Sequence, residues 1–398
     1  MKIFYNESNK SWWHNQAGLE FTCGVNKIMI PYQNSKPTSE MITLELEPSH
    51  NHDIVTIGIL TTQNSKNGIG ISGNLSLFRS LQMYLLEQRI LSYVLTIEDL
   101  LNQENCGYIY SNQHQQWQKI SVPLPHIVYN RIPLRSIESS LPFQQLKETF
   151  ISHKIIMFNP CFIDKYEMYT AFKQHEKLTS LLPQTMIVTN LKEFEAFFHK
   201  HKTIYLKPRE GNRGNGIYTL TQNKDGSLQL NSPHHNETFS SLIAYWNIYE
   251  KQLQTKKYLA QQAILPKKKN GHRYDYRLLV HYQNGLFKLT GKAVRMAQIQ
   301  EITTHVPRGG KIYPYHKVST QKIDKQLAEI AQTCGTVLSK KLGFIGEFSI
   351  DLGESETGEL YIYEVNSKPM QFDETDIEAN RLFHLKNLFI ELTKNSSK

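Results

Sequence analysis

Hydrophobic and polar positions follow different patterns along the chain. After residue 53 a continuous apolar run at 54–60 predicts a buried strand, and apolar residues then recur at helical spacing over 75–88. The run at 93–100 returns to strand and turn, which completes a βαβ unit. A further strand is expected at 123–132 and a further helix at 139–150. The pattern therefore predicts an open α/β domain over residues 51–150.

The pattern becomes mixed over residues 151–398. Helices are expected at 165–182 and 191–201, each followed by a short strand, and the later segments read as largely antiparallel strands with flanking helices. Residues 1–50 contain short apolar segments separated by Pro and Asn, which predicts a small β-rich N-terminal segment of no evident purpose. The expected fold class is thus α/β and α+β in one chain.

Composition narrows the class of protein. At 398 residues the chain exceeds what a single hydrophobic core usually serves, and 39% hydrophobic with 20% charged residues is typical of folded globular proteins. The N-terminus lacks a signal-peptide pattern, and no apolar stretch approaches the roughly 20 residues that span a bilayer. Four separated cysteines without a CxxC pair favour a reducing environment. We therefore expect a cytoplasmic protein without a membrane span.

The formal net charge of +9 favours anionic partners. Nucleotides, acidic peptides or polymers, and nucleic acid all satisfy this condition, and charge alone does not choose among them. The basic run at 266–277 could contact a polyanion, but charge runs are usually solvated loops, and the latter interpretation is preferred. No base-reading motif accompanies the charge, so nucleic acid is not expected as a partner.

A glycine-rich segment at 203–220 separates two β-rich runs. Its glycines are Gly211, Gly214 and Gly216. Glycine allows backbone N–H groups to approach phosphate oxygens. The segment is not a Walker A loop, and a strand follows it where the dinucleotide fingerprint has a helix. It therefore fits a flap over a nucleotide, with Lys207 near the phosphates. An ordinary hairpin loop with solvated Arg209 and Arg213 explains the segment alone at least as well.

The segment 346–369 reads as a β-hairpin interrupted by oxygen ligands. Strand alternation places Glu347, Ser349 and Asp351 on one face, which we expect to be solvated. On the returning strand Glu364 and Asn366 are also two residues apart. Oxygen ligands without His or Cys suit Mg²⁺ or Mn²⁺. A solvent-facing strand is the alternative, but it explains the acidic pair and the following Asn less well.

The order of the glycine flap, a basic segment and the DxL…ExN hairpin resembles the ATP-grasp superfamily over residues 151–398. The resemblance implies two subdomains that clamp ATP, with the flap subdomain at about 180–260. It assigns Lys165 and Lys207 to the phosphates, and Asp351, Glu364 and Asn366 to Mg²⁺ (or Mn²⁺). Glu347 is additional to that set, and a metal ligand, a proton-handling group and a satisfied edge residue are equally open roles for it.

The remaining positions implied by the resemblance surround the nucleotide. The adenine hinge corresponds to Gln261, Gln262, Ala263 and Ile264, where Gln262 replaces a common Glu. The ATP-binding strand offers Asp275 and Arg277, and the catalytic positions near the transferred phosphate are Arg295 and Arg308, with His305 where many relatives have Asn.

A narrower resemblance is to the YheC/YheD group, named endospore coat-associated. It rests on VYNRIPLRSIESS, FNPCFIDKYEMY, LPQT, KPREGNRGNGIY and GEFSIDL…YEVNSKP. Within the first motif, Arg131 and Arg135 could bind an acidic acceptor, or they could pair with Glu138 or neighbouring acids. Spore coat association is accordingly a possible localisation.

The resemblance implies carboxylate activation by ATP, in which an acyl phosphate is attacked by an amine to form an amide, on a peptide or a cell-surface or spore-coat substrate. Two alternatives of other classes stay open. One is a phosphotransferase on the same scaffold, and the other is a structural spore coat protein that binds nucleotide without turnover. The identity of the acid and the amine is not contained in the sequence.

Overall fold

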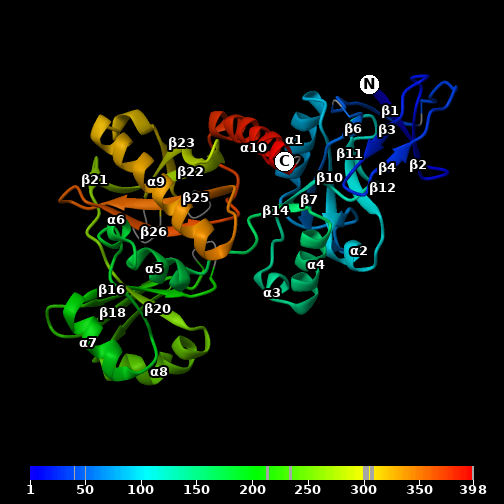
Figure 1. Cartoon of the computed structure of the whole chain (residues 1–398). Coiled ribbons are helices and arrows are strands. Elements are labelled where there is room, and N and C mark those ends of the chain that lie inside the picture. Colours follow the sequence, from blue (N-terminus) through cyan, green and yellow to red (C-terminus); the bar gives the residue numbers. More distant parts are fainter. Residues whose placement is uncertain are drawn as a thin grey trace.

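The computed structural model describes residues 1–39, 41–49, 51–211, 215–232, 235–298, 304 and 309–396. The chain forms two lobes with the last helix between them (Figure 1). The first lobe contains the N-terminal strands and an α/β sheet. The second contains two antiparallel sheets. The expected mixture of α/β and α+β structure is confirmed.

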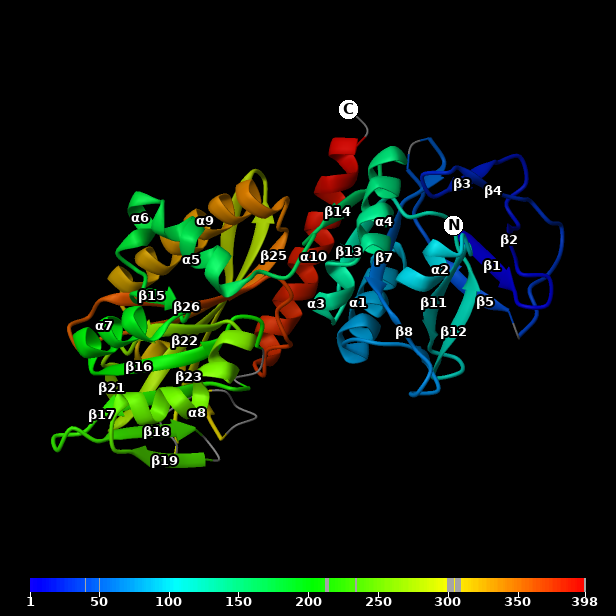
Figure 2. The same ribbon diagram turned by 90° about the horizontal axis from the view of Figure 1, so that it is seen from below.

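The N-terminal segment is built from two small three-stranded sheets. One has the order β2-β1-β5 and the other the order β4-β3-β6. Their strands are β1 (Lys2–Asn6), β2 (Ser11–His14), β3 (Phe21–Cys23), β4 (Ile28–Ile30), β5 (Ile42–Glu45) and β6 (Asp53–Ile54). Because β6 pairs with β3, the β-rich segment is joined to the start of the α/β sheet. Figure 2 shows β5 beside β11 and β12.

The α/β sheet has the order β12-β11-β10-β7-β13-β14. Its strands are β7 (Thr56–Thr61), β10 (Leu91–Thr96), β11 (Cys106–Ser111), β12 (Gln116–Ser121), β13 (Ile127–Asn130) and β14 (Ile156–Phe158). The strands β10, β7, β13 and β14 are parallel to one another, and β11 and β12 form an antiparallel edge. Every residue of β7 is buried, as the unbroken apolar run predicts.

Four helices and a small hairpin accompany this sheet. They are β8 (Gln63–Asn64), β9 (Gly70–Ile71), α1 (Leu75–Glu87), α2 (Ile97–Leu101), α3 (Arg135–Glu138) and α4 (Leu141–Ser152). Asn74 and Ser140 cap the N-termini of α1 and α4 through side-chain oxygens, which explains where both helices begin. The sequence predicted a turn after residue 96, whereas the chain forms the short helix α2 there.

The flap-side sheet is antiparallel, with the order β15-β20-β16-β17-β18-β19. Its strands are β15 (Thr185–Ile187), β16 (Thr203–Pro208), β17 (Tyr218–Gln222), β18 (Leu228–Ser232), β19 (His235–Phe239) and β20 (Tyr258–Gln262). Helices α7 (Leu191–His201) and α8 (Leu242–Thr255) pack on one face of it, where Phe194, Phe198 and Trp246 share a core with Leu206. The opposite face of this sheet borders a cleft.

The central sheet has the order β24-β23-β22-β25-β26. Its strands are β22 (His272–Gln283), β23 (Leu286–Met296), β24 (Lys311–Tyr313), β25 (Glu347–Glu354) and β26 (Leu360–Asn366), and β21 (Lys268–Lys269) pairs with β22. One face is covered by α5 (Lys165–Lys173), α6 (Glu176–Thr179) and α9 (Gln321–Leu342), and the 3-10 turn η2 (Tyr315–Lys317) precedes α9. Phe348, Ile350 and Leu352 are buried in this core, as the alternation predicts.

The last helix, α10 (Thr375–Ser396), belongs to both lobes. Leu385, Leu388 and Phe389 enter the core of the α/β sheet. Near its start, Ile377 packs with Leu279 of the central sheet. The helix therefore connects the two lobes through apolar contacts on both sides (Figure 1).

A buried ion pair lies where the two lobes and α10 meet. Glu347 and Arg381 are both 0% exposed, and the Arg381 Nε and Nη2 atoms lie 2.5 and 2.9 Å from the two Glu347 carboxylate oxygens. Tyr129 of β13 also donates to this carboxylate, and His281 Nε2 lies 3.2 Å from it. Burial raises the pKa of Glu347, but Arg381 and His281 outweigh it and hold the pKa well below its usual range.

The expectation that this face of the hairpin is solvated is wrong at its first half. Glu347 and Ser349 are fully buried, because α10 and β13 cover this end of β25. Asp351, two residues further on, is only partly covered. Alternation assigned the residues to the correct face, but it contains no information about a helix that begins more than 20 residues later and packs on that face.

Asn159 joins the lobes through a second set of hydrogen bonds. It lies directly after β14 with φ of 56°, a left-handed conformation that Asn tolerates. Its side-chain oxygen accepts from Gly346 N at 2.9 Å, and its amide nitrogen donates to the carbonyl oxygens of Glu347 (2.9 Å) and Ser367 (2.5 Å). One buried amide thus pairs with both strands of the hairpin, which gives the FNP motif a structural role.

A second buried cation completes this junction. Lys368 pairs with Glu138 and donates to Asn130 Oδ1 and to the Ile132 carbonyl, at 3.1 and 2.9 Å. Burial lowers the pKa of Lys368 to about 8, although Glu138 opposes this effect. The motifs YNRIP, FNP and NSKP, far apart in sequence, therefore meet in one polar cluster beside the Glu347–Arg381 pair. We call this cluster and the ion pair together the lobe junction.

We expect Glu347→Gln to lower the free energy of unfolding by about 3–5 kcal/mol, because it removes the carboxylate that faces Nε and Nη2 of the buried Arg381 and leaves Glu378, 3.3 Å from Nη1, as the remaining acidic partner. Chemical denaturation followed by tryptophan fluorescence measures the change. Glu359→Gln, at an exposed position of the same hairpin, is the control and should change stability by less than about 0.5 kcal/mol.

The same variant tests the alternative in which Glu347 binds metal. If Glu347→Gln keeps its stability but loses Mg²⁺-dependent nucleotide binding, then the structural role assigned to Glu347 is wrong.

Candidate active site

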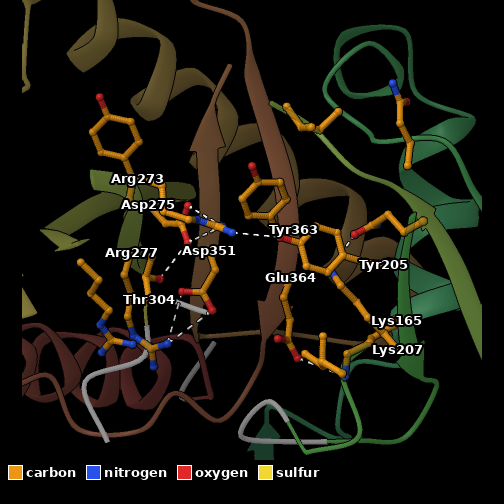
Figure 3. A pocket seen from close by; sticks show the side chains of 16 residues that line it. Lys165, Tyr205, Lys207, Arg273, Asp275, Arg277, Thr304, Asp351, Tyr363 and Glu364 are labelled. Carbon is orange, nitrogen blue, oxygen red and sulfur yellow. Dashed lines mark hydrogen bonds and ion pairs between the residues drawn. The ribbon is translucent and has the colours of Figure 1, made fainter. Parts of the chain in front are cut away.

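A cleft between the flap-side sheet and the central sheet collects most of the predicted site residues. Its lining side chains are Lys165, Tyr205, Lys207, Ile217, Gln261, Gln262, Ile264, Arg273, Asp275, Tyr276, Arg277, Arg295, Thr304, Asp351, Tyr363 and Glu364. They come from α5, β16, β20, β22, β23, β25 and β26 and from the segments that follow some of these strands (Figure 3). Residues far apart in the sequence are thus brought to one place.

Asp351 and Glu364 face each other across neighbouring strands. They are direct partners in the antiparallel register of β25 and β26, and the next pair on the same face, beyond Ile350 and Val365, is Ser349 with Asn366. Directly opposed residues share a face, so both carboxylates point into the cleft (Figure 3). Among the described cleft-lining side chains Asn366 does not appear, although it lies on the same face two pairs further along.

A β-bulge shapes this part of the cleft. The register shifts between Asp351 and Leu352, so Tyr363 is an extra residue on β26. As a result Tyr363 and Glu364, although consecutive, both line the cleft. Gly353 makes room for the tyrosine ring, since a Cβ there would lie 2.1 Å from the Tyr363 hydroxyl oxygen. Strict alternation would have placed Tyr363 on the opposite face, which is why the sequence did not reveal it.

Two lysines enter from the flap side. Lys165 Nζ lies 3.3 Å from Glu364 Oε1 and donates to the Gly211 carbonyl at 2.5 Å. Lys207 Nζ donates to Gln261 Oε1 at 2.6 Å and lies over the rings of Tyr205 and Tyr363. Burial, partly opposed by Glu364, lowers the pKa of Lys207 to about 8. The charged form of Lys207 therefore lacks a full counter-charge.

Two guanidinium groups lie at the other end of the cleft. Arg277 Nη1 is 3.3 Å from Asp351 Oδ1, and its guanidinium lies over the Phe372 ring. Arg295 Nη2 is 3.7 Å from Asp373 Oδ2. Burial lowers the pKa of Arg295, and repulsion by Arg277 lowers it further. Two buried cations that repel each other form a site that an anion would stabilise.

Arg273, Asp275 and Arg277 form a stripe along β22. They are spaced two apart, so they share one face of the strand, and all three line the cleft. Arg273 Nη2 lies 3.2 Å from Asp275 Oδ2 and Nη1 donates to the Tyr205 hydroxyl at 2.9 Å, while Thr304 donates to Asp275 at 2.7 Å.

Tyr205, Arg273 and Thr304 also line the cleft, although none of them is a predicted site residue. The same two-residue spacing, applied from Lys207 and Asp275, could have identified Tyr205 and Arg273, because each lies two positions earlier on its strand. Thr304 lies between segments outside the described residues, and no pattern pointed to it.

The predicted adenine hinge lies on β20 and just after it. Gln261, Gln262 and Ile264 line the cleft, while Ala263 N donates to the Thr203 carbonyl at 3.2 Å. Gln262 Oε1 accepts from Gln184 N at 3.2 Å.

The predicted glycine flap is described only in part. A Cβ added to Gly211 would lie 2.5 Å from Pro208 Cγ. Gly216 has φ of +70° and lies beside the Tyr258 hydroxyl. Both positions therefore require glycine. Gly214, His305 and Arg308 lie outside the described residues.

Several predicted residues do not line the cleft, and among them Glu347, Arg131 and Arg135 have other partners. Glu347 belongs to the lobe junction, where its oxygens already face Arg381, Tyr129 and His281. This geometry favours a structural role over a metal ligand. Arg131 donates to the Pro369 carbonyl at 3.0 Å and lies 3.7 Å from Glu347, which agrees with the alternative of pairing to a neighbouring acid.

Arg135 donates to the Ile163 carbonyl at 2.9 Å and lies over the Phe162 ring. Glu138, proposed as a partner for either arginine, pairs with Lys368.

The donor set fits a divalent cation of the Mg²⁺ type. Asp351 and Glu364 offer carboxylate oxygens on adjacent strands, and both are partly open to the cleft. Their partners in the structure are Arg277 and Lys165, whose positive charges offset the repulsion between the two acids. Mg²⁺ usually takes one or two protein carboxylates and completes its shell with water and phosphate oxygens. Asp351 and Glu364, with Asn366 behind them, would hold it.

Within the described residues, no helix is both long and apolar enough to cross a membrane.

Known proteins provide further comparison. The chain is 30% identical over 287 residues to the endospore coat-associated protein YheD of Bacillus subtilis (strain 168), a match that covers 69% of this chain and 61% of YheD. It is 22% identical to the endospore coat-associated protein YheC of the same organism, over 66% of this chain and 75% of YheC. The match thus spans less than two thirds of the length of YheD.

Solved structures agree on the fold. A D-alanyl-alanine synthetase A from Vibrio cholerae O1 aligns with a TM-score of 0.52 at 13% identity, over 86% of this chain and 98% of that one. The VanG D-Ala:D-Ser ligase from Enterococcus faecalis aligns with a TM-score of 0.50 at 12% identity, over 86% and 99%. The model of the YheC/D-like ATP-grasp family matches residues 154–390, which include the whole cleft. The chain belongs to the YheC/D-like ATP-grasp family.

Proposed function

We propose that the protein is an ATP- and Mg²⁺-dependent carboxylate–amine ligase that acts through an acyl phosphate. The observation that carries the proposal is the arrangement of one cleft: two lysines on the flap side, two opposed carboxylates in the middle, and two buried arginines at the far end. This order of charge suits a nucleotide whose γ-phosphate reaches the arginines. The two structural relatives named above are a D-alanyl-alanine synthetase and a D-Ala:D-Ser ligase, and their activities are consistent with the proposal.

In the first step a substrate carboxylate oxygen attacks the γ-phosphorus and ADP leaves. Lys165 and Lys207 face the phosphate chain and would exchange Glu364 and Gln261 for phosphate oxygens. Arg277 and Arg295 would stabilise the negative charge that develops on the transferred group. Asp351 and Glu364 would hold a Mg²⁺ ion, which when bound would add charge stabilisation for the phosphoryl group.

In the second step an amine nitrogen attacks the acyl carbon, the C–O bond to phosphate breaks, and inorganic phosphate leaves as the amine loses a proton. The product is an amide. The chain supplies positioning and charge in both steps and needs no nucleophilic Ser or Cys. Water must be excluded, because it would hydrolyse the acyl phosphate, and the flap-side sheet over the cleft is suited to this role.

Charge and the named relatives together support one substrate class. The buried Arg277 and Arg295 favour an anionic carboxylate substrate, and the net charge of +9 favours acidic polymers or peptides. The names of YheD and YheC, endospore coat-associated proteins, suggest that the carboxylate belongs to a peptide or a surface component of the spore coat, and the chain itself is then associated with the coat.

Hydroxylamine trapping tests the ligase proposal. With ATP, Mg²⁺ and pooled amino acids and peptides, the wild-type protein should form a hydroxamate together with ADP. Asp351→Asn and Glu364→Gln should each lower this rate by about 100-fold or more, because they weaken the metal and phosphate site. Glu359→Gln, exposed on the same hairpin, should leave the rate unchanged.

Other products identify the alternatives. A stable phosphorylated product without hydroxamate would assign phosphotransferase chemistry. Nucleotide-dependent thermal stabilisation without any ADP formation would assign a structural, non-catalytic role. Full activity in folded Asp351→Asn and Glu364→Gln variants would disprove the site itself.

Nucleotide affinity should also depend on pH through Lys207. Its pKa is about 8 in the free protein, compared with an ordinary value of 10.5, and bound phosphate should raise it again. Below pH 8 the lysine is charged in both states and affinity is flat. Above pH 8 binding must take up a proton, so affinity falls as pH rises, by up to tenfold per pH unit. Calorimetry in buffers of different ionisation enthalpy measures the proton uptake.

Lys207→Arg is the matched variant, because arginine stays charged throughout this range. Its affinity should lose the pH dependence whatever its absolute value. A wild-type affinity that is constant between pH 8 and 10, with no proton uptake, would contradict the assignment of Lys207 to the phosphates.

A further inference from the structure

The LPQT segment, residues 182–185, is hydrogen-bonded to the predicted adenine hinge. Gln184 N donates to Gln262 Oε1 at 3.2 Å, and Gln262 N donates to the Gln184 carbonyl at 2.8 Å. The described side chains that line the ATP cleft include none from this segment. The motif is part of the family resemblance, but the proposed reaction makes no use of it.

Thr185 lies on the face of the flap-side sheet that borders the ATP cleft. Thr185, Gln261 and Tyr205 are direct partners across the neighbouring strands β15, β20 and β16, so they share one face. Lys207 is two residues beyond Tyr205 on β16 and therefore shares that face too. Gln261, Tyr205 and Lys207 all line the cleft, whereas Thr185 is on the edge strand beside them.

Three hydrogen bonds run in sequence across this face, and their direction is fixed at one end. Thr185 Oγ1 donates to the Pro183 carbonyl oxygen at 2.9 Å. A carbonyl oxygen can only accept, so the single hydroxyl hydrogen is used there, and Thr185 Oγ1 accepts from Gln261 Nε2 at 3.0 Å. With its nitrogen held by Thr185, the Gln261 amide turns its oxygen to Lys207 Nζ, 2.6 Å away.

The orientation of this amide affects the charge of Lys207. Burial lowers the pKa of Lys207 to about 8. The charged groups that act on it oppose one another, since Glu364 and Asp275 raise its pKa whereas Lys165 and Arg273 lower it. The aromatic rings beside its Nζ atom belong to Tyr205 and Tyr363. An amide oxygen on the ammonium group favours the charged lysine, and an amide NH2 group in its place would disfavour it.

We propose that Thr185 is a positioning residue of the ATP site, which orients the Gln261 amide so that its oxygen faces Lys207. The LPQT segment thus acts on the nucleotide phosphates through Gln261 and Lys207 without touching them. This role rests on the proposed function, because the assignment of Lys207 to the phosphates belongs to it. The charge of Lys207 in the free chain can nevertheless be measured without nucleotide, metal or turnover.

Thr185→Val tests the proposal, because valine keeps the branched shape of threonine but cannot accept a hydrogen bond. Gln261 is only 8% exposed, and a rotation that gives its nitrogen a new acceptor moves its oxygen away from Lys207. The pKa of Lys207 should therefore fall by about one pH unit, roughly the effect of one hydrogen bond to a charged group. NMR titration of the lysine Cε signals of the free chain measures it, with the Lys207 signal identified by its loss in Lys207→Arg.

Two variants are the controls. Thr185→Ser keeps the hydroxyl and should titrate as the wild type does. Thr189→Val makes the same chemical change at an exposed position just beyond β15 and should also leave the pKa of Lys207 unchanged. Circular dichroism and the thermal midpoint establish that each variant is folded. With nucleotide, the ADP affinity of Thr185→Val should begin to fall at a lower pH than that of the wild type.

Two results would overturn the proposal. One is a wild-type pKa of Lys207 in the folded Thr185→Val variant. The other is an equal fall of that pKa in Thr185→Ser, which would trace the effect to packing and not to the hydroxyl group. The ligase reaction is tested separately by hydroxamate formation, so a failure of one test is distinguishable from a failure of the other.

Discussion

The pairing of Glu347 with Arg381 is the contact on which the arrangement of the lobes depends. Two opposite charges, both removed from water, lie where β25, β13 and α10 meet. A charge that loses its partner while it stays out of water is strongly unfavourable, so the three elements cannot shift against one another in a way that breaks the pair and leaves either ion buried. Asn159 adds neutral hydrogen bonds to the same place, and apolar residues of α10 extend the contact into both cores.

One strand face serves two purposes because its ends meet different surroundings. Glu347 and Asp351 are four residues apart and share a face of β25. Glu347 is enclosed by α10 and has a permanent arginine partner, whereas Asp351 borders the cleft and faces Arg277 from β22. The first carboxylate fixes the position of the strand. Asp351 remains accessible to an exchangeable cation. The position of that cation depends on Glu347, because Glu347 fixes the strand that carries both residues.

Periodicity predicted much of the fold, since the apolar runs of β7 and β25 and the helical spacing of α1 reflect burial on known faces. The glycine segment and the acidic hairpin by themselves pointed to Lys207 and to the pair Asp351 and Glu364, whereas Lys165 followed only from the family resemblance. Two features escaped periodicity for physical reasons. The bulge beside Asp351 changes the parity of Tyr363, and no local signal marks a one-residue shift in pairing.

The partner of Glu347 is the second such feature. Arg381 lies 34 residues further along the chain, on a helix whose docking depends on tertiary contacts. A carboxylate that alternation places on a polar strand face looks the same in the sequence whether it faces solvent, a metal or an arginine.

The position of α10 has a consequence for biosynthesis. The α/β sheet is complete before the central sheet has been translated, and the helix that fastens them follows both in the chain. During translation from the N-terminus, the first lobe can fold early, and α1 covers part of the hydrophobic side of its sheet, but the part that receives Leu385, Leu388 and Phe389 stays uncovered until α10 leaves the ribosome. A nascent chain therefore carries an exposed apolar surface through most of its synthesis, and ribosomal pausing before α10 would prolong its availability to chaperones.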